Sequence, residues 1–181
     1  MKVWKRIEPT VVDKIHYRTI VTKTFLLPNG TKKGYQTIDQ EDTHFSGVVA
    51  LTKDNHVIVA KQYRPGSEKI MDEIPGGKAD PGEDYQAAAI RELAEETGYQ
   101  PGHIELAGQI YKSAYSNGVH HYYFATGCRP IGSGQRPDDD EFIEVNLISI
   151  DKFIANALAG KMTDIGAVFL TYERLMHYKS T

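Results

Sequence analysis

The chain has little cysteine and no long apolar run. Cys128 is the single cysteine among 181 residues, so no disulfide can form within the chain. The longest apolar stretches are short, such as residues 48–51, whereas a membrane-spanning helix needs about 18 consecutive apolar residues. Residues 1–17 scatter their charges and lack the apolar run of a secretory signal. We therefore expect a cytoplasmic protein with a buried Cys128 and no membrane partner.

The sequence also lacks a strong excess of charge of either sign. Its 21 basic and 24 acidic side chains give a formal net charge of -3. No global positive field therefore favours a nucleic acid as partner. Hydrophobic residues at 40% and charged residues at 25% are typical of a globular protein with a sizeable core.

Periodicity predicts strands first, and then strands and helices together. The expected strands are residues 11–16, 19–27, 33–38, 45–51, 57–63, 70–74, 104–111, 121–125 and 142–150. The expected helices are residues 84–97, 151–158 and 164–177. This order predicts an α+β or layered α/β/α domain with a mixed sheet, preceded by an N-terminal antiparallel β ribbon.

The helix predicted over residues 84–97 has clear signals for its end and its buried face. Gly98 suits the left-handed conformation that commonly ends a helix. Small and apolar residues recur at helical spacing and predict the face against the sheet: Ala87, Ile90, Leu93 and Ala94.

Three carboxylates crowd the last turns of the same helix. Glu92, Glu95 and Glu96 stand at i, i+3 and i+4, where like charges repel, and anions near a helix C-terminus oppose its dipole. Arg91 is the only basic residue of the helix. A solvated acidic face is one interpretation, and a divalent cation held by oxygen ligands is the other.

The spacing of fixed residues around this helix resembles the signature of the Nudix hydrolases. That pattern is G, five residues, E, seven residues, REU, one residue, EE, one residue, GU, where U is bulky and apolar. The chain matches it with Gly77, Glu83, Arg91, Glu92, Leu93, Glu95, Glu96 and Gly98. Tyr99 fills the final position with an aromatic rather than an aliphatic side chain.

This resemblance implies a mixed sheet between helices and a site for Mg²⁺ or Mn²⁺. The family's principal metal ligands match Glu92 and Glu96. Glu95 would be a further ligand or a partner of the ligands, and the carbonyl of Gly76 matches a backbone ligand. Arg91 and Glu83 would orient the cluster. The expected reaction is hydrolysis of a nucleoside diphosphate derivative.

A general base is expected outside the helix, in the acidic segment of residues 136–145. Glu141 aligns best with the loop carboxylate of ADP-ribose pyrophosphatases, and Asp139 is the alternative. A short acidic run is also typical of an exposed loop without a catalytic role.

The flanking residues resemble the ADP-ribose and nucleoside diphosphate sugar pyrophosphatases. Residues 61–64 end a strand and residues 71–77 lead into the box, as in that subgroup. The resemblance implies that Arg64, Gln62 and Glu73 bind substrate. It also implies a homodimer in which residues 1–40 form a ribbon for dimerisation and substrate lining, and residues 41–181 form the hydrolase domain.

The substrate stays open within this subgroup. The loop of residues 113–118 lacks a proline common in ADP-ribose enzymes, and residues 164–166 lack the Asp-X-Lys of some nucleotide-sugar enzymes. Trp4 or Tyr17 could stack on a base or simply fill a core. Dinucleotide polyphosphates or coenzymes are alternative substrates, and a non-catalytic nucleotide sensor is the alternative outside enzymes.

Overall fold

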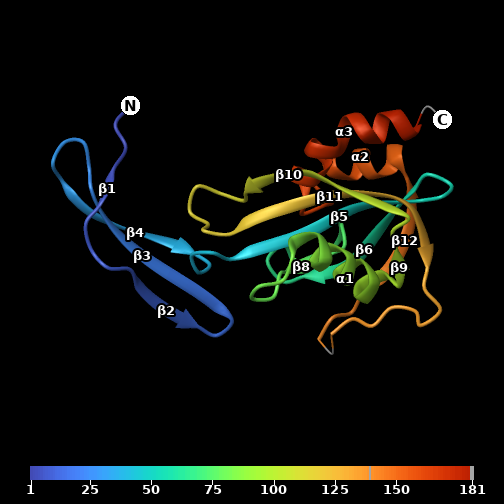
Figure 1. Cartoon of the computed structure of the whole chain (residues 1–181), viewed down its shortest axis with the longest axis horizontal. Coiled ribbons are helices and arrows are strands. Elements are labelled where there is room, and N and C mark those ends of the chain that lie inside the picture. Colours follow the sequence, from blue (N-terminus) through green and yellow to red (C-terminus); the bar gives the residue numbers. More distant parts are fainter. Residues whose placement is uncertain (139, 180–181) are drawn as a thin grey trace. The chain divides into compact units, whose positions relative to one another are not determined.

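The computed structural model describes residues 1–138 and 140–179 and divides into two compact units (Figure 1). The ribbon unit comprises Met1–His44 and Tyr111–Val119. The sandwich unit comprises Phe45–Ile110 and His120–Thr181. Within the described residues, no helix is both long enough and apolar enough to cross a bilayer.

The ribbon unit is an antiparallel sheet centred on β3 (Arg18–Leu26), which confirms the predicted N-terminal ribbon. The strand β3 pairs with β1 (Lys5–Arg6), β2 (Val11–Ile15) and β4 (Lys32–Ile38). Asn117 fastens the loop of residues 111–119 to this sheet: Lys23 Nζ donates to its Oδ1 at 2.6 Å, and its Nδ2 donates to Thr37 Oγ1 at 2.9 Å.

The two aromatics considered for base stacking have different surroundings in the ribbon unit. The Trp4 ring packs 5.3 Å from the Tyr35 ring and 6.1 Å from the Phe25 ring. Tyr17 is 86% exposed. Trp4 therefore belongs to a small aromatic cluster of the sheet, and Tyr17 projects from it.

The sandwich unit is built on an eight-stranded mixed sheet. Its central order is β10 (His103–Tyr111), β11 (Val119–Pro130), β5 (His44–Thr52), β6 (His56–Arg64) and β12 (Glu144–Ser149). Three shorter strands extend it: β7 (Lys69–Glu73) pairs with β6, β8 (Gly76–Lys78) with β5, and β9 (Tyr99–Gln100) with β11.

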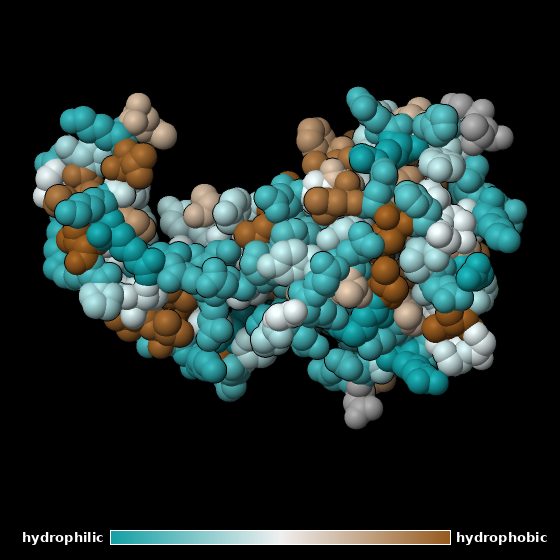
Figure 2. All heavy atoms as spheres, in the orientation of Figure 1, coloured by the Kyte–Doolittle hydropathy of each residue, from teal (hydrophilic) through white to brown (hydrophobic). Residues whose placement is uncertain are grey.

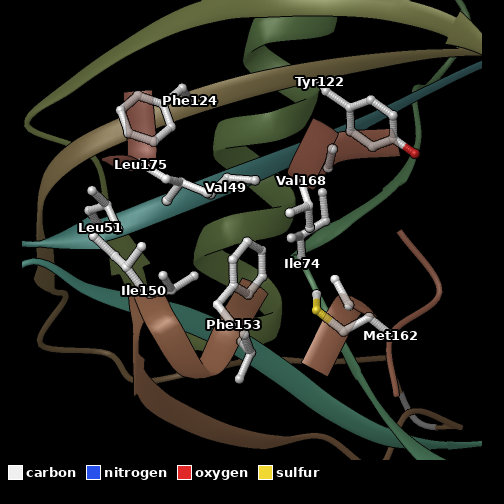
Figure 3. Packing of buried hydrophobic residues seen from close by; sticks show 14 residues of the cluster. Val49, Leu51, Ile74, Tyr122, Phe124, Ile150, Phe153, Met162, Val168 and Leu175 are labelled. Atoms are coloured by element: carbon white, nitrogen blue, oxygen red, sulfur yellow. The ribbon is translucent and has the colours of Figure 1, made fainter. Parts of the chain in front are cut away.

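Helices cover both faces of this sheet. The helix α1 (Tyr85–Thr97) lies on one face, and α2 (Ile150–Leu158) and α3 (Ile165–Lys179) lie on the other (Figure 1). Successive residues of a strand point to opposite faces, so each core strand supplies both layers. Along β5, Val49 and Leu51 pack with Phe153 and Leu175 of α2 and α3 (Figure 3), and Val48 joins the layer beneath α1. The predicted α/β/α sandwich is confirmed.

The buried face of α1 differs from the predicted one. Its buried residues are Ala88, Ala89, Leu93, Glu96 and Thr97. Ala87 is exposed, and Ile90 and Ala94 are only half-buried, so the stripe predicted from these three was wrong and only Leu93 of the four is fully buried. An apolar pattern could not include Glu96, which the fold turns inward. The predicted end at Gly98 is confirmed, with φ of 71°.

The short strands β1, β8 and β9 were not predicted, because two or three residues give no period to detect. The strand β11 runs from Val119 to Pro130, well beyond the predicted residues 121–125. Cys128 on this strand is buried, as predicted, and its burial raises the pKa of the thiol to about 11.

Candidate functional site

The short strand β8 brings the two glycines against the core strand β5. Gly76 pairs with Gly47 and Gly77 pairs with Ser46. A Cβ on Gly76 would lie 2.6 Å from the Ser46 carbonyl oxygen and 2.7 Å from the Gly47 Cα. Backbone atoms occupy both positions, so only glycine fits at residue 76.

Helix α1 supplies carboxylates to the same glycines. The Gly76 N–H donates to Glu96 Oε2 at 3.0 Å. A Cβ on Gly77 would lie 2.4 Å from Glu92 Oε1, so the Glu92 carboxylate rests directly against the bare Cα of Gly77. The structure thus brings Gly76, Gly77, Glu92 and Glu96 together, although 15 residues separate Gly77 from Glu92.

Arg91 ties the outer carboxylates of the cluster to the helix. Its Nε and Nη2 donate to the two Glu83 oxygens, each at 3.0 Å. Its Nη1 donates to Glu92 Oε1 at 2.9 Å and to Glu95 Oε2 at 3.0 Å. These hydrogen bonds raise the pKa of the guanidinium. Glu83 makes the largest contribution, and Glu95 and Glu92 make smaller ones. Arg91 therefore compensates part of the repulsion, and it fixes the Glu92 carboxylate in place.

Glu96 is the most deeply buried carboxylate of the helix, at 4% exposure. Burial raises its pKa to about 8, against the lowering effect of the Gly76 N–H bond, and the nearby carboxylates of Glu92, Glu141 and Glu73 raise it further. Burial also raises the pKa of Glu92. A bound cation would favour the ionised forms that the protein alone disfavours.

The metal-free protein is expected to lose stability as the pH rises from about 4.5 to about 8. In this range the unfolded chain has released the Glu96 proton, whereas the folded chain retains it. The unfolded state then binds fewer protons, so the free energy of unfolding falls with increasing pH. Thermal unfolding in EDTA across this range measures the slope, and Glu96→Gln should flatten it. An equal slope in wild type and Glu96→Gln would contradict the assignment.

The residues of the cluster fit a divalent cation. No three or more His, Cys, Asp or Glu side chains meet as a complete metal cage in the described ranges 1–138 and 140–179. Mg²⁺ does not need one, because it usually takes one or two carboxylates and fills its shell with waters and phosphate oxygens. Glu92 and Glu96, with the Gly76 backbone beside them, provide such a partial set.

The acidic loop between β11 and β12 borders a cavity that the Glu92 carboxylate also lines. This cavity of about 400 Å³ is lined by Gly76, Gly77, Lys78, Asp80, Arg91, Glu92, Glu95, Asp138 and Glu141. The Glu141 side chain accepts from the Asp138 N–H at 3.2 Å. The structure thus brings Glu141 to the predicted site, whereas the alternative base, Asp139, lies outside the described residues.

Two backbone bonds fix the start of this loop to the end of α1. The Arg136 N–H donates to the Glu95 carbonyl at 2.6 Å, and the Ile131 N–H donates to the Gly98 carbonyl at 2.8 Å. A Cβ on Gly98 would lie 2.8 Å from Gln135 N. Gly98 therefore does more than end the helix, because its lack of a side chain lets the loop approach.

The three predicted substrate residues form one hydrogen-bonded group on β6 and β7. The Arg64 Nε lies 2.8 Å and 2.9 Å from the two Glu73 oxygens, and Nη2 also donates to Glu73. The Gln62 Nε2 donates to Glu73 Oε2 at 3.2 Å. Glu73 is 4% exposed, whereas the Arg64 side chain is 44% exposed. The buried carboxylate thus anchors a guanidinium that reaches solvent.

Sequence reasoning missed several side chains of the site. Lys78, Asp80 and Asp138 line the cavity, and Thr163 donates to Glu73 at 2.9 Å. The first three lie within three residues of predicted residues in the sequence and could have been found by that proximity. Thr163 carries no such signal, because it lies 90 residues from Glu73.

Comparisons with known proteins show which family this sequence resembles. Residues 43–169 match the profile of the NUDIX domain. The methanol dehydrogenase activator of Bacillus methanolicus is 35% identical over 130 residues, which cover 70% of this chain and 68% of that protein. The ADP-ribose pyrophosphatase of Bacillus subtilis (strain 168) is 30% identical over 126 residues, covering 69% and 67%. The ADP-sugar pyrophosphatase of Mus musculus is 30% identical over 158 residues, covering 80% and 70%.

A solved structure of an ADP compounds hydrolase has the same fold. Its TM-score is 0.76 at 20% sequence identity, and the match covers 96% of this chain and 97% of that one. Two of the curated relatives carry names from the ADP-ribose and nucleotide-sugar pyrophosphatase subgroup, which confirms the predicted resemblance. The chain belongs to the Nudix hydrolase family, as the spacing of its glycines and glutamates predicted.

Proposed function

We propose that the protein hydrolyses the pyrophosphate bond of ADP-ribose or a related nucleoside diphosphate sugar, giving AMP or another nucleoside monophosphate and a sugar phosphate. One observation carries this proposal: the buried carboxylate of Glu96, which lies in one cluster with the partly buried Glu92, is near the half-exposed Arg64 of the same unit. Glu96 is close enough to raise the pKa of the Arg64 guanidinium, after the larger effect of Glu73. A diphosphate needs both partners, because it offers oxygens to a cation and to a guanidinium.

In this proposal Glu92, Glu96 and the Gly76 carbonyl hold Mg²⁺ or Mn²⁺, and Glu95 is a further ligand or supports them. The bound cation would neutralise the diphosphate and lower the pKa of a bound water. Arg91 and Glu83 keep the Glu92 carboxylate against Gly77. These residues therefore orient the cluster rather than touch substrate.

Glu141 is proposed as the general base and Arg64 as the phosphate-binding group. Glu141 lies on the cavity with Glu92 and Glu95, where its carboxylate could accept a proton from the attacking water. Arg64 uses Nε and Nη2 for Glu73, so its Nη1 can contact a phosphate or ribose oxygen. Gln62 and Glu73 hold this guanidinium.

A panel of substrates tests the proposal against its alternatives. The panel contains ADP-ribose, other nucleoside diphosphate sugars, dinucleotide polyphosphates and coenzymes, each read by chromatography of the products. ADP-ribose or a nucleotide sugar should give the highest kcat/KM. A dinucleotide polyphosphate or coenzyme as the best substrate would favour another Nudix activity. Tight binding of a nucleotide without turnover in Mg²⁺ or Mn²⁺ would favour a non-catalytic sensor.

We also propose that the ribbon unit forms a homodimer. Its edge strand β2 exposes Val11, Val12 and Ile15, each about half in solvent. Hydrophobic side chains are visible on the surface of the ribbon unit (Figure 2). Exposed apolar side chains on an unpaired strand edge are typical of a contact surface.

The dimer should be broken by a charge in β2. Ile15→Glu is expected to give a monomer in light scattering after size exclusion, because a buried carboxylate without a partner is costly. Lys14→Glu, a charge change at the neighbouring exposed position, is the matched control. A monomeric wild type, or a dimeric Ile15→Glu, would contradict the proposed interface.

A further inference from the structure

The segment between α2 and α3 reaches the buried carboxylate that anchors Arg64. Thr163 Oγ1 lies 2.9 Å from Glu73 Oε1 and 3.0 Å from Asp164 Oδ2. The segment is fixed to β7 beside Glu73, because the Asp72 N–H donates to the Lys161 carbonyl at 3.0 Å. The Asn156 Nδ2 also donates to Asp72 Oδ2 at 2.5 Å. Thr163 is therefore held at a defined place beside Glu73.

The difference in burial decides which of two carboxylates accepts the Thr163 proton. A hydroxyl has one proton to donate, and Thr163 faces two carboxylates. Glu73 is 4% exposed, whereas the contact between Thr163 and Asp164 lies at the exposed surface. A carboxylate shielded from water needs a protein donor more than one that water can reach, so we assign the Thr163 proton to Glu73.

The Glu73 carboxylate accepts hydrogen bonds from several side chains, and these bonds together set the direction of the Arg64 guanidinium. Its two oxygens accept from Arg64 Nε and Nη2, from Gln62 Nε2 and from Thr163 Oγ1. Gln62 approaches Oε2 and Thr163 approaches Oε1, so the two hold the carboxylate from opposite oxygens. Loss of one donor would let the carboxylate rotate, and the bidentate guanidinium would rotate with it.

We propose that Thr163 is a positioning residue that acts through Glu73 to aim the Arg64 guanidinium at the substrate's diphosphate. This inference rests on the proposed function for the identity of the ligand, but the placement of Arg64 does not. The segment joining α2 and α3 thereby takes part in substrate binding without touching the substrate.

Thr163→Val tests the inference because valine removes the hydroxyl and keeps the branched shape. KM for ADP-ribose should rise about five- to tenfold, as expected for the loss of one hydrogen bond of ordinary net strength, with kcat within about twofold. Thr163→Ser keeps the hydroxyl and should restore KM to within about twofold of wild type. An unchanged KM in Thr163→Val, or no rescue by serine, would overturn the inference.

A double-mutant cycle with Arg64→Ala separates positioning from general damage. If Thr163 acts through Arg64, Thr163→Val should add no further increase in KM once Arg64 is absent. An equal increase in both backgrounds would show that Thr163 affects binding by another route, and the inference would fail.

A readout without substrate keeps this test independent of the proposed function. The Arg64 Nε–H resonance in ¹⁵N–¹H NMR, assigned by its loss in Arg64→Lys, should be protected from exchange in wild type and Thr163→Ser. Its exchange should accelerate several-fold in Thr163→Val. If the protein does not cleave ADP-ribose but this pattern holds, the proposed function fails and the positioning stands. If turnover is found but exchange is unchanged in Thr163→Val, the positioning fails alone.

Discussion

Glu96→Gln is expected to lower kcat for ADP-ribose by more than about a hundredfold, since even an outer partner of a metal ligand contributes about 10- to 100-fold. Glutamine keeps the shape and can still accept from the Gly76 N–H, but it removes the negative charge offered to the cation. Because burial raises the pKa of Glu96 to about 8, the substitution also removes a charge that is unfavourable in the metal-free fold. Activity and stability should therefore change in opposite directions.

Steady-state kinetics in Mg²⁺ and thermal unfolding in EDTA at pH 8 measure the two effects. The matched control is Glu173→Gln, an exposed glutamate on α3 that lies away from the cavity and should leave both quantities unchanged. Wild-type turnover in Glu96→Gln would remove Glu96 from the metal site. A large loss of stability would show that the buried carboxylate supports the fold instead.

Gly77→Ala is expected to lower kcat about 100-fold with little loss of stability. The new Cβ would lie 2.4 Å from Glu92 Oε1, so the carboxylate must move. A carboxylate ends a flexible side chain and can move at low cost to the fold, but a shift of even about 1 Å at a catalytic centre can cost about 100-fold in rate. The binding of Mn²⁺, followed by electron paramagnetic resonance, should weaken in parallel.

Gly76→Ala provides the contrast one residue earlier. There the new Cβ would meet the Ser46 carbonyl oxygen and the Gly47 Cα, which are backbone atoms of the core strand β5. The fold should therefore lose stability, by about 1 to 3 kcal/mol if the overlap behaves like overpacking in a core. Unfolding in denaturant compares the two variants. If both lost stability equally, the clash at Gly77 would not be confined to the Glu92 side chain.

The general architecture could be predicted because periodicity and turn residues are local signals. The apolar core strand β5 and the end of α1 at Gly98 are both readable along a few residues, and both are confirmed. The buried face of α1 could not be predicted from the sequence, since the Glu96 side chain points inward to accept a hydrogen bond from Gly76 on the strand β8. A hydrophobic pattern places carboxylates outside by default.

For the site as well, residues within the local signature could be predicted, and residues brought in by distant contacts could not. The fixed spacing of the signature points to Glu92, Glu96 and Arg91, and the structure brings these three together with Gly77. Thr163 enters the site only because the chain returns beside β7 after α2. A single sequence carries no signal for a contact between residues so far apart, so this role could come only from the structure.

Hydrolysis of ADP-ribose by the wild-type protein in Mg²⁺, in Mn²⁺ and in EDTA, with products separated by chromatography, tests the metal-dependent activity most directly. We expect equal amounts of AMP and ribose 5-phosphate with either metal and no products in EDTA. Release of these products at full rate in EDTA would contradict the metal site at Glu92 and Glu96. Intact ADP-ribose under all three conditions would contradict the proposed substrate.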